Sequence, residues 1–143
     1  MSEYQLQVRS FKPAAASTTS VAAAQTLGGA GNMTLAGTAA TFAGTNTVAL
    51  ITLTSTGNIS GVNFTITGTD ANGDTQTETI AGPNNATVST TKYYATVTQI
   101  AASGAVGTNT SAGNSAETAG VIFAGANRVK GAQITTGGTI GDI

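Results

Sequence analysis

Residues 62 to 80 carry the pattern that restricts the fold most strongly. In VNFTIT the apolar residues alternate with polar ones, and a second alternating run, TQTETI, follows at 75 to 80. A period of two places successive side chains on opposite faces of a β-strand. Asn72-Gly73 stands between the two runs, and this pair favours a tight hairpin turn because both residues tolerate positive φ. The pattern therefore predicts an antiparallel β-hairpin.

Further runs of this kind occur along the chain, separated by turn-forming stretches such as 82 to 85. In YATVTQIAAS, alternate residues from Tyr94 to Ile100 are predicted to share a face, while Tyr93 and Tyr94 point to opposite faces, one to the core and one to the surface. The additional predicted strands span 4–11, 47–54, 88–91, 94–103, 121–123 and 128–135, with a brief strand near Val106 in a stretch, 103–120, that otherwise reads as loop. This spacing predicts an all-β fold, either an antiparallel sandwich or a jelly-roll-like domain, with extended N- and C-terminal arms.

Residues 14 to 46 are low in complexity and consist mainly of Ala, Ser, Thr and Gly. The Ala-rich piece 21 to 25 is compatible with a helical turn, but Gly28-Gly29 argues against a long helix. The stretch has too few bulky apolar side chains to fold by itself. We therefore divide the chain into an N-terminal strand and a segment that packs on assembly (1–46), a sandwich core (47–136) and a C-terminal arm (137–143).

Ionisable side chains are scarce, since only 8% of the 143 residues are charged and the net charge is −1, against about 25% charged residues in a typical soluble domain. Near-zero charge promotes association, so we expect a protein packed against other copies or a larger particle. The 5 basic residues are too scattered to indicate nucleic acid. No apolar run approaches the roughly 18 residues that span a bilayer. The start, MSEYQ, lacks the pattern of a secretory signal, which fits synthesis in the cytoplasm.

Histidine and cysteine are absent from the sequence. The commonest general base and the Ser-His and Cys-His nucleophile pairs are therefore missing. Asp70 and Asp74 form a poor catalytic pair, because a solvated turn does not raise the pKa of a carboxyl group. The glycine-rich stretches at 28–31 and 137–138 lack the Gly-Lys-Ser/Thr ending of a phosphate loop. We expect no enzymatic activity, no cofactor and no small-molecule substrate.

The stretch from Asp70 to Asp74, DANGD, places oxygen-bearing side chains at alternate positions, as the start of a calcium loop does. Its glycine, however, stands at the fourth position instead of the sixth. Ala81 occupies the twelfth position, where a calcium loop has a bidentate Glu. A hairpin loop in which Asp and Asn cap their own backbone explains the same residues. We prefer the hairpin loop and expect no metal site.

The block from Ile51 to about Gly107 resembles small bacteriophage virion proteins. The resemblance lies in a Ser/Gly loop, the strand and hairpin FTITGTDANG, then TETI followed by GP, and a final strand with KYY, TVT and Ile. It covers about two-fifths of the chain and carries over no active-site residue. It implies a structural role in the virion, as a trimeric capsid decoration (cement) protein bound where coat subunits meet.

The resemblance thus predicts that the partners are the major capsid protein and copies of the chain itself, as a homotrimer, without nucleic acid or membrane. The arms are expected to contact the coat through Tyr4, Leu6, Val8, Phe11, Ile140 and Ile143. Two other functions remain open: a tail or head–tail (neck or tube) protein, and a glycan-binding fibre or adhesin module. The glycan-binding function would rely on Tyr93 or on the Asp70–Asp74 loop.

Overall fold

The computed structural model describes residues 10–36, 44–45 and 47–119, and every regular element in them is a β-strand. The strands are β1 (Lys12–Pro13), β2 (Ser17–Leu27), β3 (Gly31–Asn32), β4 (Gly44–Thr45), β5 (Val48–Ser55), β6 (Asn63–Thr69), β7 (Thr75–Ala81), β8 (Thr87–Tyr94), β9 (Thr96–Ala102) and β10 (Val106–Ala119). The described part of the chain contains no helix long and apolar enough to cross a membrane.

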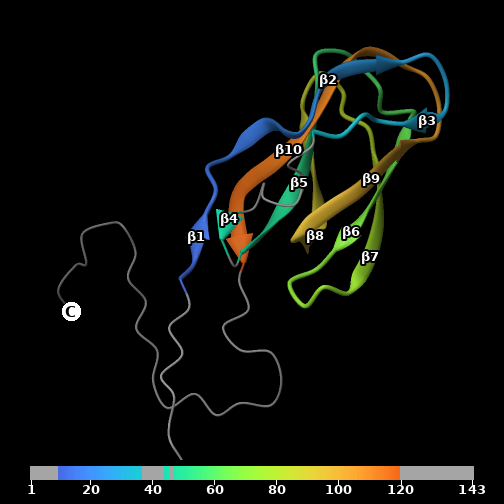
Figure 1. The fold of residues 1–143 in the computed structure, drawn as a ribbon. Helices are drawn as coiled ribbons and strands as arrows, with labels where there is room; N and C mark the ends of the chain where they lie inside the picture. The colour runs from blue at the N-terminus through green and yellow to red at the C-terminus, as the bar shows by residue number, and fades with distance from the viewer. Residues whose placement is uncertain (1–9, 37–43, 46, 120–143) are drawn as a thin grey trace, which may run out of the picture.

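Eight of these strands form two four-stranded antiparallel sheets, ordered β2-β10-β5-β8 and β3-β9-β6-β7, while β1 and β4 form a small separate sheet (Figure 1). The pairs β2–β10, β3–β9, β5–β8 and β6–β7 are nested, as in one long hairpin. The pairs β10–β5 and β9–β6 roll that hairpin into two layers. Eight antiparallel strands connected in this way form a jelly roll. The predicted all-β antiparallel sandwich is confirmed.

The hydrophobic core lies between the two sheets and follows the alternation seen in the sequence. Along β6 the buried residues alternate with half-buried threonines, as a strand with one face inward requires. The largest apolar side chains in the core belong to Tyr94, Phe64, Ile51, Leu53, Ile66 and Ile100, each 0% exposed. The limited supply of bulky residues is thus concentrated in a single layer.

The predicted hairpin between β6 and β7 is confirmed, with Thr69 and Thr75 paired at its end. Asp70 closes the turn, because its backbone N–H donates to the Asp74 carbonyl at 2.9 Å. Gly73 has φ +87, a conformation that favours glycine. The next turn also lies where it was predicted, and Asn85 within it has φ 48.

Two long strands, besides the short β3 and β4, occupy stretches in which the sequence predicted little regular structure. Residues 17–27 form the 11-residue strand β2, where the sequence indicated at most a helical turn, and residues 106–119 form the 14-residue strand β10, where it indicated loop. Strand β10 lies between β2 and β5. The prediction of loop was therefore wrong from 106 to 119, where the sequence indicated only a brief strand near Val106. Both four-stranded sheets also include residues that precede 47, in β2 and in β3.

The predicted strand 94–103 is divided in the structure. Tyr94 ends β8, Ala95 lies in a bend, and β9 starts at Thr96. The register of β9 against β6 also shifts after Thr67. As a result Thr98 is exposed while Ile100 is buried, so the prediction that alternate residues from Tyr94 to Ile100 share one face was wrong. The predicted strands at 121–123 and 128–135 lie outside the described residues.

Candidate interaction surface

The outward face of the sheet β3-β9-β6-β7 is covered by short uncharged polar side chains. In this sheet Phe64 and Ile66 point into the core, so the residues between them point outward. The register places Thr65 opposite Thr79 and Thr67 opposite Thr77. We call this surface the threonine face, which comprises Asn32, Thr65, Thr67, Thr69, Thr75, Thr77, Thr79, Thr96, Gln99 and Ala101.

Hydroxyl groups on the threonine face hydrogen-bond to one another across the strands. The Oγ1 atoms are 2.9 Å apart in Thr65–Thr79 and 3.3 Å apart in Thr67–Thr77. A third pair, Thr69–Thr96, has an Oγ1 separation of 2.7 Å. Each pair uses one of its two hydroxyl hydrogens, so each pair keeps one donor for an outside partner.

Side-chain amides continue this network to the edge of the sheet, where Gln99 Nε2 donates to Asn32 Oδ1 at 3.0 Å. None of the residues of the threonine face is ionisable. The carboxylates nearest in sequence are Asp70 and Asp74, in the hairpin turn, and Glu78, whose side chain binds the backbone of β8 instead. Among the described residues, the one charged group bonded to a residue of this face is the Lys92 ammonium, which donates to the Thr77 carbonyl at 2.9 Å at the β7 edge. Covering the threonine face itself would bury no charged side chain, and the cost of desolvation would come from its hydroxyl and amide groups.

Strands β7 and β8, which end their respective sheets, are joined by the side chain of Glu78. Its Oε1 accepts hydrogen bonds from the Thr91 backbone N–H at 2.8 Å and from the Thr91 hydroxyl at 2.9 Å, and its Oε2 accepts one from the Lys92 N–H at 2.9 Å. Partial burial acts to raise the pKa of Glu78, but these hydrogen bonds and the Lys92 ammonium group together lower it. The Gln76 amide also bonds to the Tyr93 carbonyl, so two side chains of β7 cap the outer edge of β8.

Tyr94 is the largest buried side chain, and its hydroxyl donates to the Ile66 carbonyl at 3.3 Å. Burial, with a smaller contribution from the negative charge of Glu78, raises the pKa of Tyr94 to about 12. The phenol therefore stays neutral at physiological pH. Its neighbour Tyr93 is half-buried, as expected for adjacent residues of one strand that point to opposite faces.

The Asp70–Asp74 turn uses its own oxygen atoms internally. Asp70 Oδ1 accepts the backbone N–H groups of Asn72 at 2.8 Å and Asp74 at 3.0 Å. Among the described residues no group of three or more Asp, Glu, His or Cys side chains is placed to hold a metal ion. The predicted capping of the turn by its own side chains is confirmed for Asp70.

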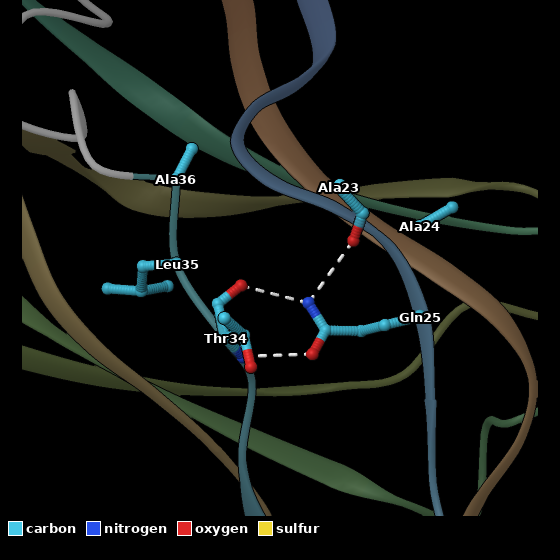
Figure 2. Close-up of a pocket in the computed structure, with 6 residues that line it drawn as sticks. All are labelled: Ala23, Ala24, Gln25, Thr34, Leu35 and Ala36. Atoms are coloured by element: carbon cyan, nitrogen blue, oxygen red, sulfur yellow. Dashed lines mark hydrogen bonds between the residues drawn. The ribbon is translucent and has the colours of Figure 1, made fainter.

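A shallow depression of about 290 Å³ lies beside β2 and is lined by Ala23, Ala24, Gln25, Thr34, Leu35 and Ala36 (Figure 2). Gln25 spans it: its Nε2 donates to the Thr34 carbonyl at 2.9 Å, and its Oε1 accepts the Thr34 N–H at 2.8 Å. None of these six described residues is an acid or a base. Gln25 Nε2 also donates to the Ala23 carbonyl at 3.2 Å, and the Ala36 N–H donates to the Val21 carbonyl at 2.7 Å. The amide thus adds to the backbone contact between this edge of β2 and residues 34–36.

Of the six predicted contact residues, only Phe11 is described. Its side chain is 37% exposed, and it precedes β1 without belonging to a strand. Tyr4, Leu6, Val8, Ile140 and Ile143 lie outside the described residues, as do positions 4–9 of the predicted first strand. The contact role of these residues stays a prediction.

The threonine face was not predicted, although its signal is present in the sequence. The runs TITGT at 65–69 and TQTET at 75–79 place threonine at every second position. The hairpin register brings the two series onto the same face. The sequence analysis used these runs only to predict strands.

No protein-family model, no curated protein and no solved structure matches this chain. Its class therefore rests on the strand topology, which defines an antiparallel jelly-roll domain with one continuous uncharged face.

Proposed function

We propose that this chain is a non-catalytic structural protein of a bacteriophage virion, a capsid decoration protein that stabilises the shell by bridging coat subunits. Its partners would be the major capsid protein and copies of itself, arranged as a homotrimer on the particle. The protein would be made in the host cytoplasm and would function in the virion.

The observation that carries the proposal is the threonine face. None of its residues is ionisable, six of its seven threonine hydroxyls are paired across the strands, and each pair retains one donor. A partner that offers carbonyl or hydroxyl acceptors would cover it at small desolvation cost. Such a surface is suited to being covered permanently by another protein.

Two further observations support a virion role. The jelly roll recurs in viral capsid proteins, although it also occurs in lectins and cupins, and a fold does not by itself define a function. The block from Ile51 to Gly107 resembles small virion proteins in the order of its strands and turns. Together they favour a shell component over an unrelated binding domain.

The proposed mechanism is a clamp made of many weak contacts. Each copy would cover the boundary between coat subunits with its sheet face, and Phe11, exposed beside β1, would add an apolar contact from the N-terminal arm. One interface of this kind contributes little energy, but repetition over a shell multiplies it. The shell would then resist the pressure of the packaged DNA.

The test places one positive charge at the centre of the threonine face. Thr67→Lys should reduce occupancy on particles that lack the protein about tenfold or more, because burying an unpaired ammonium group is costly. Thr26→Lys is the matched control, because Thr26 is an exposed strand threonine in the other sheet. Both variants should keep the circular dichroism spectrum of the parent protein. Equal occupancy of the two variants would reject the threonine face as the contact surface.

The arm and the location in the virion are tested separately. Deletion of residues 1–13 should abolish particle binding and leave the sandwich folded, and normal occupancy would reject the arm contact. Quantitative mass spectrometry of separated heads and tails should find the protein with the heads. Recovery from tails alone would instead favour the tail or neck function, and recovery from neither would reject the virion proposal.

A further inference from the structure

The tip of the β6–β7 hairpin combines three features that bear on the chemistry of asparagine. Asn72 and Gly73 are both exposed, and no atom lies close to the place where a Cβ of Gly73 would be. Asn72 is the only asparagine in the sequence that is followed by glycine. The Gly73 N–H is held by one hydrogen bond to the Asp70 carbonyl at 3.2 Å, at the long end of the normal range.

From this geometry we propose that Asn72 is a site of spontaneous deamidation, and that Asp70 limits its rate. The backbone nitrogen of Gly73 attacks Cγ of Asn72 and forms a C–N bond, while the Cγ–Nδ2 bond breaks. Ammonia leaves with the proton that the Gly73 nitrogen gives up. Water then opens the resulting five-membered imide at either carbonyl, which yields aspartate or isoaspartate.

The neighbouring residues explain why the reaction selects this position. The nitrogen of the following residue must approach Cγ closely, and any side chain on that residue hinders the approach. Every other exposed asparagine of the described residues is followed by a residue with a side chain, which stands in the way: for example, Ile59 follows Asn58, and Asn85 follows Asn84. Gly73 presents no such obstacle, and water reaches the turn from outside.

Asp70 acts as a positioning residue in this proposal. Its Oδ1 accepts the N–H groups of Asn72 at 2.8 Å and Asp74 at 3.0 Å, which holds the backbone on both sides of the reacting bond. The attack requires the peptide between Asn72 and Gly73 to rotate out of this arrangement. Removing the carboxylate frees that rotation and should accelerate the reaction.

The products change the hairpin tip in two ways. Either product adds one negative charge between Asp70 and Asp74, at the end of the threonine face. Isoaspartate also inserts a methylene group into the backbone of the turn, which disturbs the pairing register of β6 and β7 next to the turn. The reaction is independent of the proposed virion function and would take place in the isolated protein.

The experiment incubates the full-length protein in mildly alkaline heavy-oxygen water and maps the modified peptides by mass spectrometry. We expect modification at Asn72 with one heavy oxygen incorporated, more isoaspartate than aspartate, and no comparable change at Asn58, Asn84 or Asn85. Asn72→Gln should abolish the signal. A rate at Asn72 no higher than at the other exposed asparagines would overturn the proposal.

The role of Asp70 is tested by two variants, one that removes its oxygen atoms and one of equal size that keeps an acceptor. Asp70→Ala should accelerate the modification several-fold, toward the rate of a free peptide spanning 68–76. Asp70→Asn keeps an Oδ1 acceptor and should remain close to the parent rate. Equal rates for the two variants, with circular dichroism spectra like that of the parent, would reject the positioning role of Asp70.

Discussion

Polar residues contribute to the core of this protein because each of them finds a partner. Asn114 is 1% exposed, and its Oδ1 accepts the Ser20 hydroxyl at 2.7 Å. Its Nδ2 donates to the carbonyls of Ala15 at 3.0 Å and Ser115 at 3.1 Å. Within the described part of the chain no buried side-chain polar atom lacks a hydrogen bond. A chain poor in large apolar residues can therefore still bury a complete layer.

The buried phenol of Tyr94 should make the protein sensitive to alkali. Because its pKa is raised to about 12, against about 10 in an unfolded chain, the folded state favours the neutral form. The contribution to stability is complete below pH of about 10 and is lost as the pH rises toward the folded-state value. In an ultraviolet titration, one of the 3 tyrosines should ionise late, together with unfolding.

Tyr94→Phe is the control for this titration. It should remove the late phase and cost about 0.5 to 1.5 kcal/mol, because one hydrogen bond is lost while the ring still packs. If all tyrosines of the folded parent protein ionised together at a pH of about 10, the raised pKa that we assign to Tyr94 would be contradicted.

At the level of elements, side chains protect the open edges of the sheets. Glu78 and Gln76 cap β8, and Gln25 binds the backbone of Thr34 beside β2. Exposed strand edges otherwise invite pairing with other chains. A protein with a net charge of only −1 has little repulsion to prevent such pairing, so these caps help to direct association away from the edges.

Glu78 should make the protein sensitive to acid as well. Its pKa is lowered in the folded state, so its contribution to stability is present above the unfolded value of about 4.3 and is lost as the pH falls through the folded-state value. Glu78→Gln should cost about 1 to 2 kcal/mol at neutral pH. Chemical denaturation at several pH values should show this difference shrinking in acid. A difference independent of pH would contradict the assignment.

The close approach of the neighbouring strands β2 and β10 depends on Gly113. A Cβ at this position would lie 1.8 Å from the Ser17 carbonyl oxygen, so Gly113→Ala should cost about 2 kcal/mol or more by forcing the strands apart. Gly107 lies in the same strand with nothing within 4 Å of its Cβ position. Gly107→Ala should leave the melting temperature unchanged or raise it slightly, and equal effects of the two substitutions would contradict the close approach.

Elements with strong alternation were predictable from the sequence, and the others were not, for a physical reason. The hairpin of β6 and β7 shows its pattern because one face meets the core and the other meets solvent. Strand β10 is covered on both faces near Gly113, and its buried residues there are small or polar, as at Ser111 and Asn114. Such a strand has no alternation to detect. The same holds for the threonine face, which exists only once the register is known.

For the whole molecule, the nested pairing makes β10 indispensable. Leu27 pairs with Val106, and Thr54 pairs with Ser111, so neither β2 nor β5 has its main neighbour until β10 is present. Pairing between distant segments also slows folding, because long loops must close before contacts form. We expect folding in milliseconds to seconds, slower than hairpin formation alone.

Truncation after Ala105 tests this dependence. The shortened chain lacks β10, including the buried Val106 and Ala112, and should be unfolded by circular dichroism and rapidly digested by protease. Deletion of residues 1–13, which removes only β1 from the described strands, serves as the control and should keep a cooperative melting transition. A cooperative transition in the truncated chain would show that the remaining strands fold without closure.

The pairing of β2 with β10 also decides how the protein bears force. Ser17, at the start of β2, lies opposite Asn114, where the pairing of β10 with β2 ends. A force that pulls the start of β2 and the end of β10 apart would therefore act first on this last pair of residues. The hydrogen bonds between the two strands would then break one after another, starting from this end, and strands separated in this way come apart at low force. A load applied across the broad side of a sheet would instead be shared by all its strands.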